Sequence, residues 1–172
     1  MEQIPKEVIE TVLDHIDGLS SEKMNEMNYN FGKEQPVLTE YLTKEFDTFH
    51  EREVVVRCIF LYSVIFFSYQ SYGRKLKMVD TETAARTKTL LVEHINIPKG
   101  SSIAIDKLEE DLKALINQDE LIDFVLFYIF GEDEFPNEYT HPEDAYNLIV
   151  CIFLLILCTN NEVKKCLDSS VN

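Results

Sequence analysis

The chain has 172 residues, of which 45% are hydrophobic, so it is long enough to bury a core without disulfides or a structural metal. Five glycines and five prolines are too few for a β-rich protein full of tight turns, and they favour helices joined by short loops. A formal net charge of -15 repels phosphate, so nucleic acid and anionic membranes are excluded as predicted partners.

Helical signals begin at the N-terminal end of the chain. One helix is expected from Pro5 to near Gly18, because proline is favoured in the first helical turn and glycine just after the last. Ser20 or Ser21 can cap a second helix. Pro36 then opens a third helix, so the first forty residues predict three short amphipathic helices.

The fourth predicted helix is the most apolar of the first half. Thr48 and Glu51 have the spacing of a capping box, which predicts the start of this helix. It is expected to run to Gly73. Residues 73–80 then form a polar and basic connector between the two halves of the chain.

The second half repeats this organisation. A helix is expected over 81–96, a second from Asp106, and a third from Asp119 to Gly131. Pro142 opens an eighth helix that ends near Cys158. Thr159 and Glu162 could cap a short ninth helix. The sequence therefore predicts an all-α compact bundle of eight to nine helices in one domain, 1–172.

Two apolar segments are candidates for membrane spans. The segment 54–69 is interrupted by Arg57 and two serines, and 145–158 has fourteen residues where about 20 are needed to cross a bilayer. Both are interpreted as core helices. Residues 1–5 lack the basic start and apolar run of a signal peptide, and we expect a cytoplasmic protein without membrane contact.

Four short segments of the first half recur in the second half in the same order. The pairs are 12–17 with 91–96, 20–21 with 101–102, 35–42 with 118–125, and 58–61 with 151–154. The spacing between paired segments increases from each pair to the next, as a duplication with insertions would give, although amphipathic helices also resemble one another by chance. The duplication hypothesis divides the chain into four-helix halves, 5–72 and 81–160.

The duplication makes three structural predictions. The fourth and eighth helices should contact each other at the centre of the fold. Cys58 and Cys151, which occupy matching places in the recurring CIFL segment, should lie close together. Phe60 and Phe153 should both be buried.

The four cysteines do not predict a metal site or disulfides. The cysteines are Cys58, Cys151, Cys158 and Cys166; three of them lie in or beside apolar segments, and none belongs to a Cys-x-x-Cys pair. Burial raises the pKa of a thiol and makes it a poor nucleophile. They are interpreted as reduced thiols of a cytoplasmic protein.

Histidines give only weak candidate sites. His15 and His94 follow an acid and precede an isoleucine in both halves, which suggests a paired site, but a histidine is also favoured at a helix end. Asp47 and His50 are three residues apart, but Thr48 is expected to cap a helix between them. We predict no catalytic, cofactor-binding or metal-binding residue from these patterns.

Clustered acids raise the hypothesis of a metal-dependent all-α hydrolase. Glu109 and Glu110 begin such a motif, but Lys113 stands where a further acid is needed. Glu120 with Asp123 fits the second half of the motif. The acidic loop 132–144 lacks the ligand pattern of an EF-hand, so whether it binds a cation is left open.

Charge is unevenly distributed along the chain. Residues 1–72 and 101–172 are acidic, whereas 73–100 carry a small excess of positive charge. This basic segment could connect the two acidic halves or contact an acidic patch on a second copy. The basic residues that stand out in it are Arg74, Lys75, Lys77, Arg86 and Lys88.

The sequence favours an interaction domain over an enzyme. The leading hypothesis is a non-catalytic acidic helical domain that binds a protein partner or self-associates through the basic segment. A second hypothesis is an immunity-type inhibitor that neutralises a basic partner, because opposite charge speeds association. The third is the hydrolase described above, and no motif names a cofactor.

Overall fold

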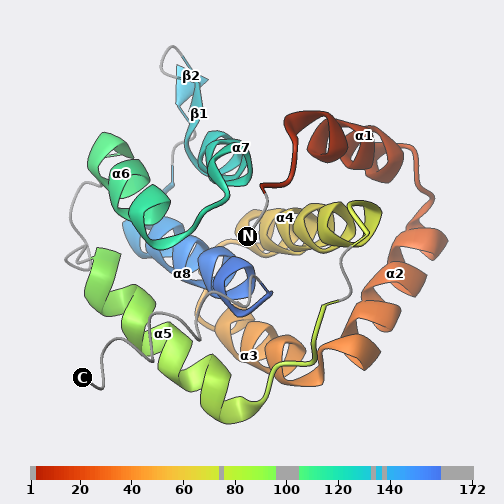
Figure 1. Cartoon of the computed structure of the whole chain (residues 1–172), viewed down its shortest axis with the longest axis horizontal. Coiled ribbons are helices and arrows are strands. Elements are labelled where there is room, and N and C mark those ends of the chain that lie inside the picture. The colour runs from red at the N-terminus through yellow and green to blue at the C-terminus, as the bar shows by residue number, and fades with distance from the viewer. Residues whose placement is uncertain (1–2, 74–75, 96–104, 133–134, 137–138, 160–172) are drawn as a thin grey trace.

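The computed structural model describes residues 3–73, 76–95, 105–132, 135–136 and 139–159 (Figure 1). Within these residues the protein is all-α, as predicted, apart from one short hairpin. The helices are α1 (Lys6–Asp17), α2 (Ser21–Glu34), α3 (Pro36–Phe46), α4 (Arg52–Ser71), α5 (Thr81–Ile95), α6 (Ile105–Leu115), α7 (Asp119–Phe130) and α8 (Pro142–Thr159). The predicted ninth helix lies outside the described residues.

The hairpin interrupts a segment that was expected to be a loop. Strands β1 (Gly131–Glu132) and β2 (Phe135–Pro136) pair antiparallel directly after α7. Gly131 ends α7 with a positive φ of 81°, a conformation that glycine adopts without the steric cost paid by other residues.

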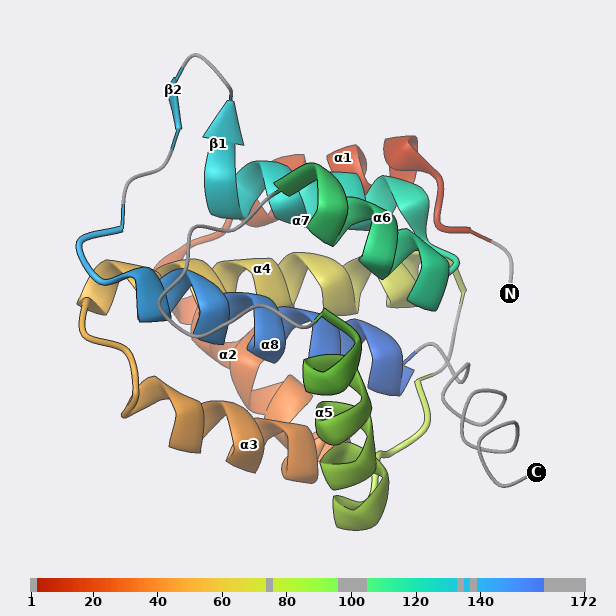
Figure 2. The same ribbon diagram turned by 90° about the vertical axis from the view of Figure 1, so that its left-hand side faces the viewer.

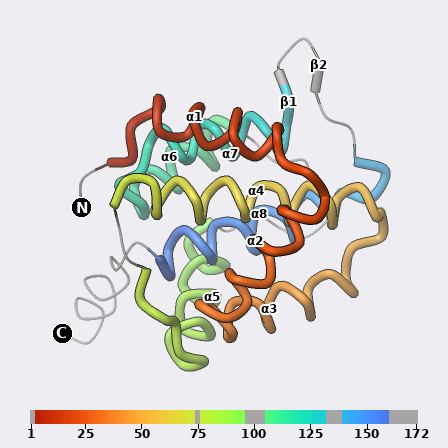
Figure 3. Tube along the Cα trace, turned by 90° about the vertical axis from the view of Figure 1, so that its right-hand side faces the viewer, coloured from red at the N-terminus to blue at the C-terminus, as the bar shows by residue number. Residues whose placement is uncertain are grey.

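The helices are arranged in three layers (Figures 2 and 3). Helices α4 and α8 form the middle layer; α1, α6 and α7 cover one side, and α2, α3 and α5 cover the other. One continuous cluster of buried hydrophobic side chains includes residues from all eight helices. Each outer layer therefore combines one helix from one half of the chain with two from the other.

Helices α4 and α8 are central because they are apolar around most of their circumference. They contact each other, as the sequence predicted. Both are long and apolar enough to cross a membrane by length and composition alone, but 56% of the α4 window and 78% of the α8 window are buried inside the protein. A core helix passes the same test, so these helices do not settle where the protein resides.

The recurring CIFL segments lie within these two helices. The thiols of Cys58 and Cys151 are within hydrogen-bonding reach, and this contact, followed by burial, raises the pKa of Cys58 well above its usual value. The expected proximity of the two cysteines is therefore present. Phe153 is fully buried, whereas Phe60 is only partly buried and packs on Tyr128 of α7, at 5.4 Å between ring centroids.

Several predicted helix ends are confirmed. Pro5 and Gly18 flank α1, and Pro36 occupies the first turn of α3. The Ser20 hydroxyl accepts a hydrogen bond from the Lys23 backbone N–H at 3.4 Å, so Ser20 rather than Ser21 caps α2.

The predicted capping box of the fourth helix is wrong. The Thr48 hydroxyl donates to the carbonyl of Glu45 at 2.7 Å and so belongs to the turn that ends α3. Helix α4 begins at Arg52, and Glu51 precedes it without making a side-chain cap. A carboxylate from α8, Asp144, takes over this role from a distance of 93 positions in the sequence.

Two buried glutamines hold the two halves together in the same manner. Gln118 precedes α7, and its side-chain oxygen accepts the backbone N–H of Ile4 at 2.8 Å. Gln35 precedes α3, and its side-chain oxygen accepts the backbone N–H of Val79 at 3.1 Å. Ile4 and Val79 each lie two residues before a helix, α1 and α5 respectively. Each half therefore anchors the first helix of the other half.

Candidate functional site

The main candidate site is a groove between α1 and α7. The two helices run parallel, because the Gln118–Ile4 hydrogen bond joins their N-terminal ends and Asp17 lies close to Tyr128 near their C-terminal ends. Burial, and then the charge of Asp17, raise the pKa of Tyr128 above its usual value. The groove has a volume of about 460 Å³.

An aromatic wall lines the α7 side of this groove. The ring of Tyr128 lies 4.8 Å from that of Phe124 and 5.9 Å from that of Phe127, measured between centroids. Ile9 and Leu13 contribute apolar surface from α1. Phe127 is 50% exposed, so a large part of its ring faces solvent at the groove. Exposed aromatic surface beside a groove is typical of protein-binding sites.

The helices that border the groove are strongly acidic. Together α1 and α7 contain seven Asp and Glu residues and one lysine, Lys6. Lys6 pairs with Glu10 at 3.6 Å, and Glu120 and Asp123 also line the groove. The surroundings of the apolar surface therefore favour a positively charged ligand.

Asp123 belongs to an ion-pair cluster behind the rim. Lys113 of α6 pairs with Asp123 at 2.6 Å and with Glu109 at 2.7 Å. Burial lowers the pKa of Lys113, but its hydrogen bonds to these two carboxylates outweigh burial and raise it. Two of the four acids of the hydrolase hypothesis, Glu109 and Asp123, thus converge on a lysine.

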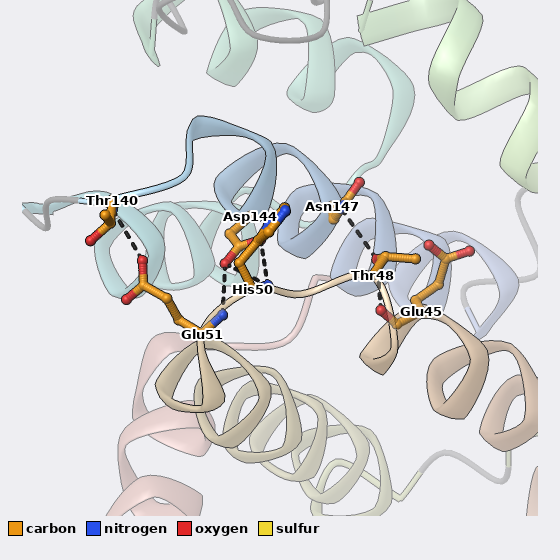
Figure 4. Close-up of polar contacts among 7 residues, drawn as sticks. All are labelled: Glu45, Thr48, His50, Glu51, Thr140, Asp144 and Asn147. Carbon is orange, nitrogen blue, oxygen red and sulfur yellow. Dashed lines mark hydrogen bonds and ion pairs between the residues drawn. The ribbon is translucent and has the colours of Figure 1, made fainter.

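A second polar cluster joins the starts of α4 and α8 (Figure 4). Asp144 is fully buried, and its carboxylate accepts the backbone N–H of His50 at 3.1 Å and of Glu51 at 3.2 Å. The same carboxylate lies 2.9 Å from Nδ1 of His50, which must carry a proton to donate. The ring of His141 stacks on that of His50 at 4.2 Å.

The cluster is reciprocal between the two helices. The Glu51 carboxylate accepts the backbone N–H of Thr140, before α8, at 3.1 Å. Asn147 of α8 donates to the Thr48 hydroxyl at 3.3 Å. These bonds hold two helix starts together, and the Asp144 oxygens are already occupied by N–H donors. The cluster therefore has a structural role, which is to fix the starts of α4 and α8 relative to each other.

The histidine pairs suggested by the sequence are not brought together. His15 is exposed in the last turn of α1, and His94 in that of α5, in the opposite outer layer (Figure 2). The Nε2 atom of His94 lies 3.2 Å from the carbonyl of Asp111. Asp47 ends α3, and His50 pairs with Asp144 instead of sharing a helix with Asp47.

The described residues contain no group of three or more His, Cys, Asp or Glu side chains placed to hold a metal ion. Glu110 and Glu120 are exposed. The acidic loop 132–144, whose cation binding the sequence leaves open, lies partly outside the described residues.

The basic segment 73–100 lies partly within the described residues. Arg74 and Lys75 lie outside the described residues. Arg86 pairs with Glu82 on its own helix, whereas Lys88 of α5 pairs with Glu45 of α3 at 2.5 Å. This last ion pair joins the two halves of the chain, which is one of the two roles expected for the segment.

Three of the four cysteines are described, and all three are buried and free. Burial raises the pKa of the Cys158 thiol to about 12. Cys166 lies outside the described residues. These thiols have the environment of core residues and not of nucleophiles.

The groove itself was not predicted from the sequence. The sequence contained one feature that could have indicated it, the apolar residue Phe127, which falls on the exposed side of α7. The buried positions of this helix are Leu121, Ile122, Val125, Leu126 and Ile129. No family model, no curated protein and no solved structure matches the chain.

Proposed function

We propose that this chain is a non-catalytic acidic interaction domain that binds a protein partner with a basic surface. The observation that supports it best is the open groove between α1 and α7, where exposed aromatic surface is lined by three acidic residues and one lysine, on two helices that together carry seven acids. Apolar contact gives affinity at such a site, and the acidic rim speeds association and selects a cationic partner.

Neutralising a basic enzyme, as an immunity-type inhibitor does, is one specific form of this function. The same acidic surface supports it, and the identity of the partner would decide between the two. The reduced, buried thiols fit a cytoplasmic location, which is part of the proposal.

The experiment begins with capture of partners by the intact protein, followed by purification of each partner and measurement of its affinity. We expect a partner with a basic surface whose affinity falls several-fold between roughly 50 and 300 mM salt. Reversing Glu10 and Glu120 to lysine should weaken binding more than reversing Glu22 and Glu26, two exposed acids of α2. An affinity that changes neither with salt nor with either pair of charge reversals would overturn the proposal.

A metal titration tests the hydrolase alternative. If the chain has no specific metal site, then magnesium, manganese, zinc and calcium leave its melting temperature unchanged. Specific binding at 100 times the dissociation constant would add about 2.7 kcal/mol of stability. A large shift with one metal alone would favour the hydrolase.

We also infer that the two halves of the chain arose by duplication. Three observations support this inference. Gln35 and Gln118 make the same kind of anchor at equivalent helix starts. Helix α1 packs on α4 as α5 packs on α8, and Cys58 meets Cys151 where α4 contacts α8.

A further inference from the structure

The groove between α1 and α7 has a counterpart between α5 and α3. Gln35 and Gln118 have nearly the same backbone conformation, with φ and ψ of -132° and 61° against -148° and 60°. Counting from these anchors, each α7 residue corresponds to the α3 residue 83 positions earlier. Counting from Ile4 and Val79, each α5 residue corresponds to the α1 residue 75 positions earlier.

Burial supports this correspondence. The buried residues of α1 are Ile9, Val12 and Ile16, and the positions 75 further on are Ala84, Thr87 and Leu91, which are the buried residues in the same part of α5. In the same way, the buried positions of α3, Leu38 and Leu42, correspond to Leu121 and Val125 of α7.

An ion pair bridges the two helices at the counterpart. Lys88 of α5 pairs with Glu45 of α3, and its ammonium lies over the ring of Tyr41 at 5.9 Å. The positions that correspond to Lys88 and Glu45 are Leu13 and Tyr128. The groove between α1 and α7 therefore has two apolar side chains where its counterpart has a charged bridge.

Phe127 differs from its counterpart even more clearly. The corresponding residue of α3 is Lys44, an exposed lysine that pairs with Glu40 at 2.7 Å. The equivalent place in α3 thus holds an exposed lysine, so the helix itself does not require an aromatic ring there. The ring of Phe127 packs edge-on against Tyr128 but stays half exposed, and exposed aromatic rings are common binding anchors.

We propose that the groove binds one amphipathic α-helix of the partner, with its apolar face on Phe127, Tyr128 and Leu13 and with lysine or arginine on its flanks. This inference rests on the proposed function and names the surface and the shape of the ligand. The lining residues span 6–13 on α1 and 120–128 on α7, or roughly 10 to 12 Å at 1.5 Å per residue. That length matches about two helical turns, which present apolar anchors at positions i, i+3 or i+4, and i+7.

The charge of the groove favours cationic flanks on the bound helix. Glu10, Glu120 and Asp123 lie along it. Lys6 pairs with Glu10 and Lys113 pairs with Asp123, but the three carboxylates outnumber these two lysines. At its far end Asp17 stands beside the C-terminal ends of the parallel helices α1 and α7, and helix C-termini carry partial negative charge. A lysine or arginine of the partner is therefore stabilised at this end.

The test uses a defined peptide and the intact protein. The probe is a synthetic peptide of roughly 15 residues with leucines at helical spacing and lysines on both flanks. One comparison peptide is a scrambled sequence of the same composition, and the other replaces each lysine with glutamate. Fluorescence anisotropy should show binding of the first peptide and binding about tenfold weaker or worse for the other two.

Two variants alter the groove in ways that the counterpart already tolerates. Phe127→Lys introduces the residue of the counterpart, and Leu13→Lys with Tyr128→Glu introduces its ion pair without changing the net charge. Both should weaken binding of the amphipathic peptide about tenfold, while the circular dichroism spectrum of the protein stays unchanged. Met78→Lys is the matched control, because Met78 is 70% exposed before α5 and the substitution adds the same charge.

The outcomes separate this inference from the function on which it rests. If the scrambled peptide binds as tightly as the amphipathic one, or if Phe127→Lys weakens binding no more than Met78→Lys, the helix-binding groove is wrong while an acidic interaction domain survives. Failure of the amphipathic peptide to bind also overturns the proposal of a helix-binding groove. The proposed function is then tested separately, by the affinity of the captured partner.

Discussion

The hydroxyls of two tyrosines, one buried and one partly buried, have opposite surroundings. Tyr62 packs edge-on against Phe31 at 4.3 Å, but its hydroxyl has no hydrogen-bond partner among the described residues. The hydroxyl of Tyr139 donates to the carbonyl of Ile129 at 2.7 Å and accepts from Arg57 at 2.9 Å. A buried polar group without a partner costs stability, whereas a paired one contributes to it.

We therefore expect Tyr62→Phe to leave the free energy of unfolding unchanged or to raise it by about 1 kcal/mol. Tyr139→Phe, the same chemical change at the paired hydroxyl, should lower it by about 1 to 3 kcal/mol. Urea denaturation measures both. Equal losses for the two variants would show that the Tyr62 hydroxyl has a stabilising partner.

The buried thiols predict an alkaline loss of stability. Contact with Cys151 and burial raise the pKa of Cys58, and burial raises the pKa of Cys158 to about 12. The folded protein then holds protons that the unfolded chain releases above about pH 9, so this stability is complete below that pH and falls as the pH rises further.

Denaturant midpoints measured from pH 7 to about pH 11 should decline only above about pH 9. Cys158→Ala should make the decline shallower by as much as 1.4 kcal/mol per pH unit, the slope due to one proton. Parallel curves for the variant and the parent would contradict the assignment of Cys158.

Helices α4 and α8 share an apolar character but place their phenylalanines differently. We expect Phe153→Ala to cost about 3 to 5 kcal/mol, because it empties a fully buried site. Phe60→Ala should cost less than half as much, because Phe60 is partly exposed beside Tyr128. Urea denaturation tests this, and equal costs would mean that Phe60 is buried more deeply in solution.

The two anchoring glutamines provide a test at the level of helix placement. Gln118→Ala leaves the backbone N–H of Ile4 without its partner, and Gln35→Ala does the same to Val79. Each should cost about 1 to 3 kcal/mol. Gln70→Ala is the control, because this exposed glutamine bonds only weakly to Glu34, at 3.3 Å. Losses as small as that of the control would mean that other contacts place α1 and α5.

The sequence predicted the helices well because their signals are local. Pro5, Gly18, Ser20 and Pro36 act on neighbouring residues, and all four lie where expected. Thr48 failed as a cap because a long-range partner, Asp144, binds the backbone before α4 instead. Periodicity within one helix gives no information about such partners.

Local sequence patterns predicted neither the groove nor the correspondence between α1 and α5, for a related reason. The recurring segments 12–17 and 91–96 are 79 positions apart, whereas the buried positions of α1 and α5 match at 75. The difference of four residues is about one helical turn, which leaves the apolar face unchanged. The open groove is lined by Leu13 of α1 and Tyr128 of α7, and the sequence alone does not show that these two helices lie next to each other.

At the scale of the whole molecule, the halves are interleaved and not side by side. Helix α1 shares an outer layer with α6 and α7, and α5 shares the other with α2 and α3 (Figure 3). An isolated half would lose the partner of its first helix and would expose the surface of α4 or α8 that contacts the other. The cost of that exposed apolar area exceeds what a small half could recover.

Separate expression of 1–75 and 76–172 tests this interleaving. We expect each fragment alone to show weak helical signal and no cooperative melting, because each lacks the partner glutamine and the covering helices of the other. Mixing them in equal amounts should restore a cooperative transition by circular dichroism. Gln118→Ala in the second fragment should weaken this complementation, since it removes the anchor of Ile4 on the first. A cooperative melt of either fragment alone would instead mean that the halves are independent domains, and that the prediction of one domain over 1–172 is wrong.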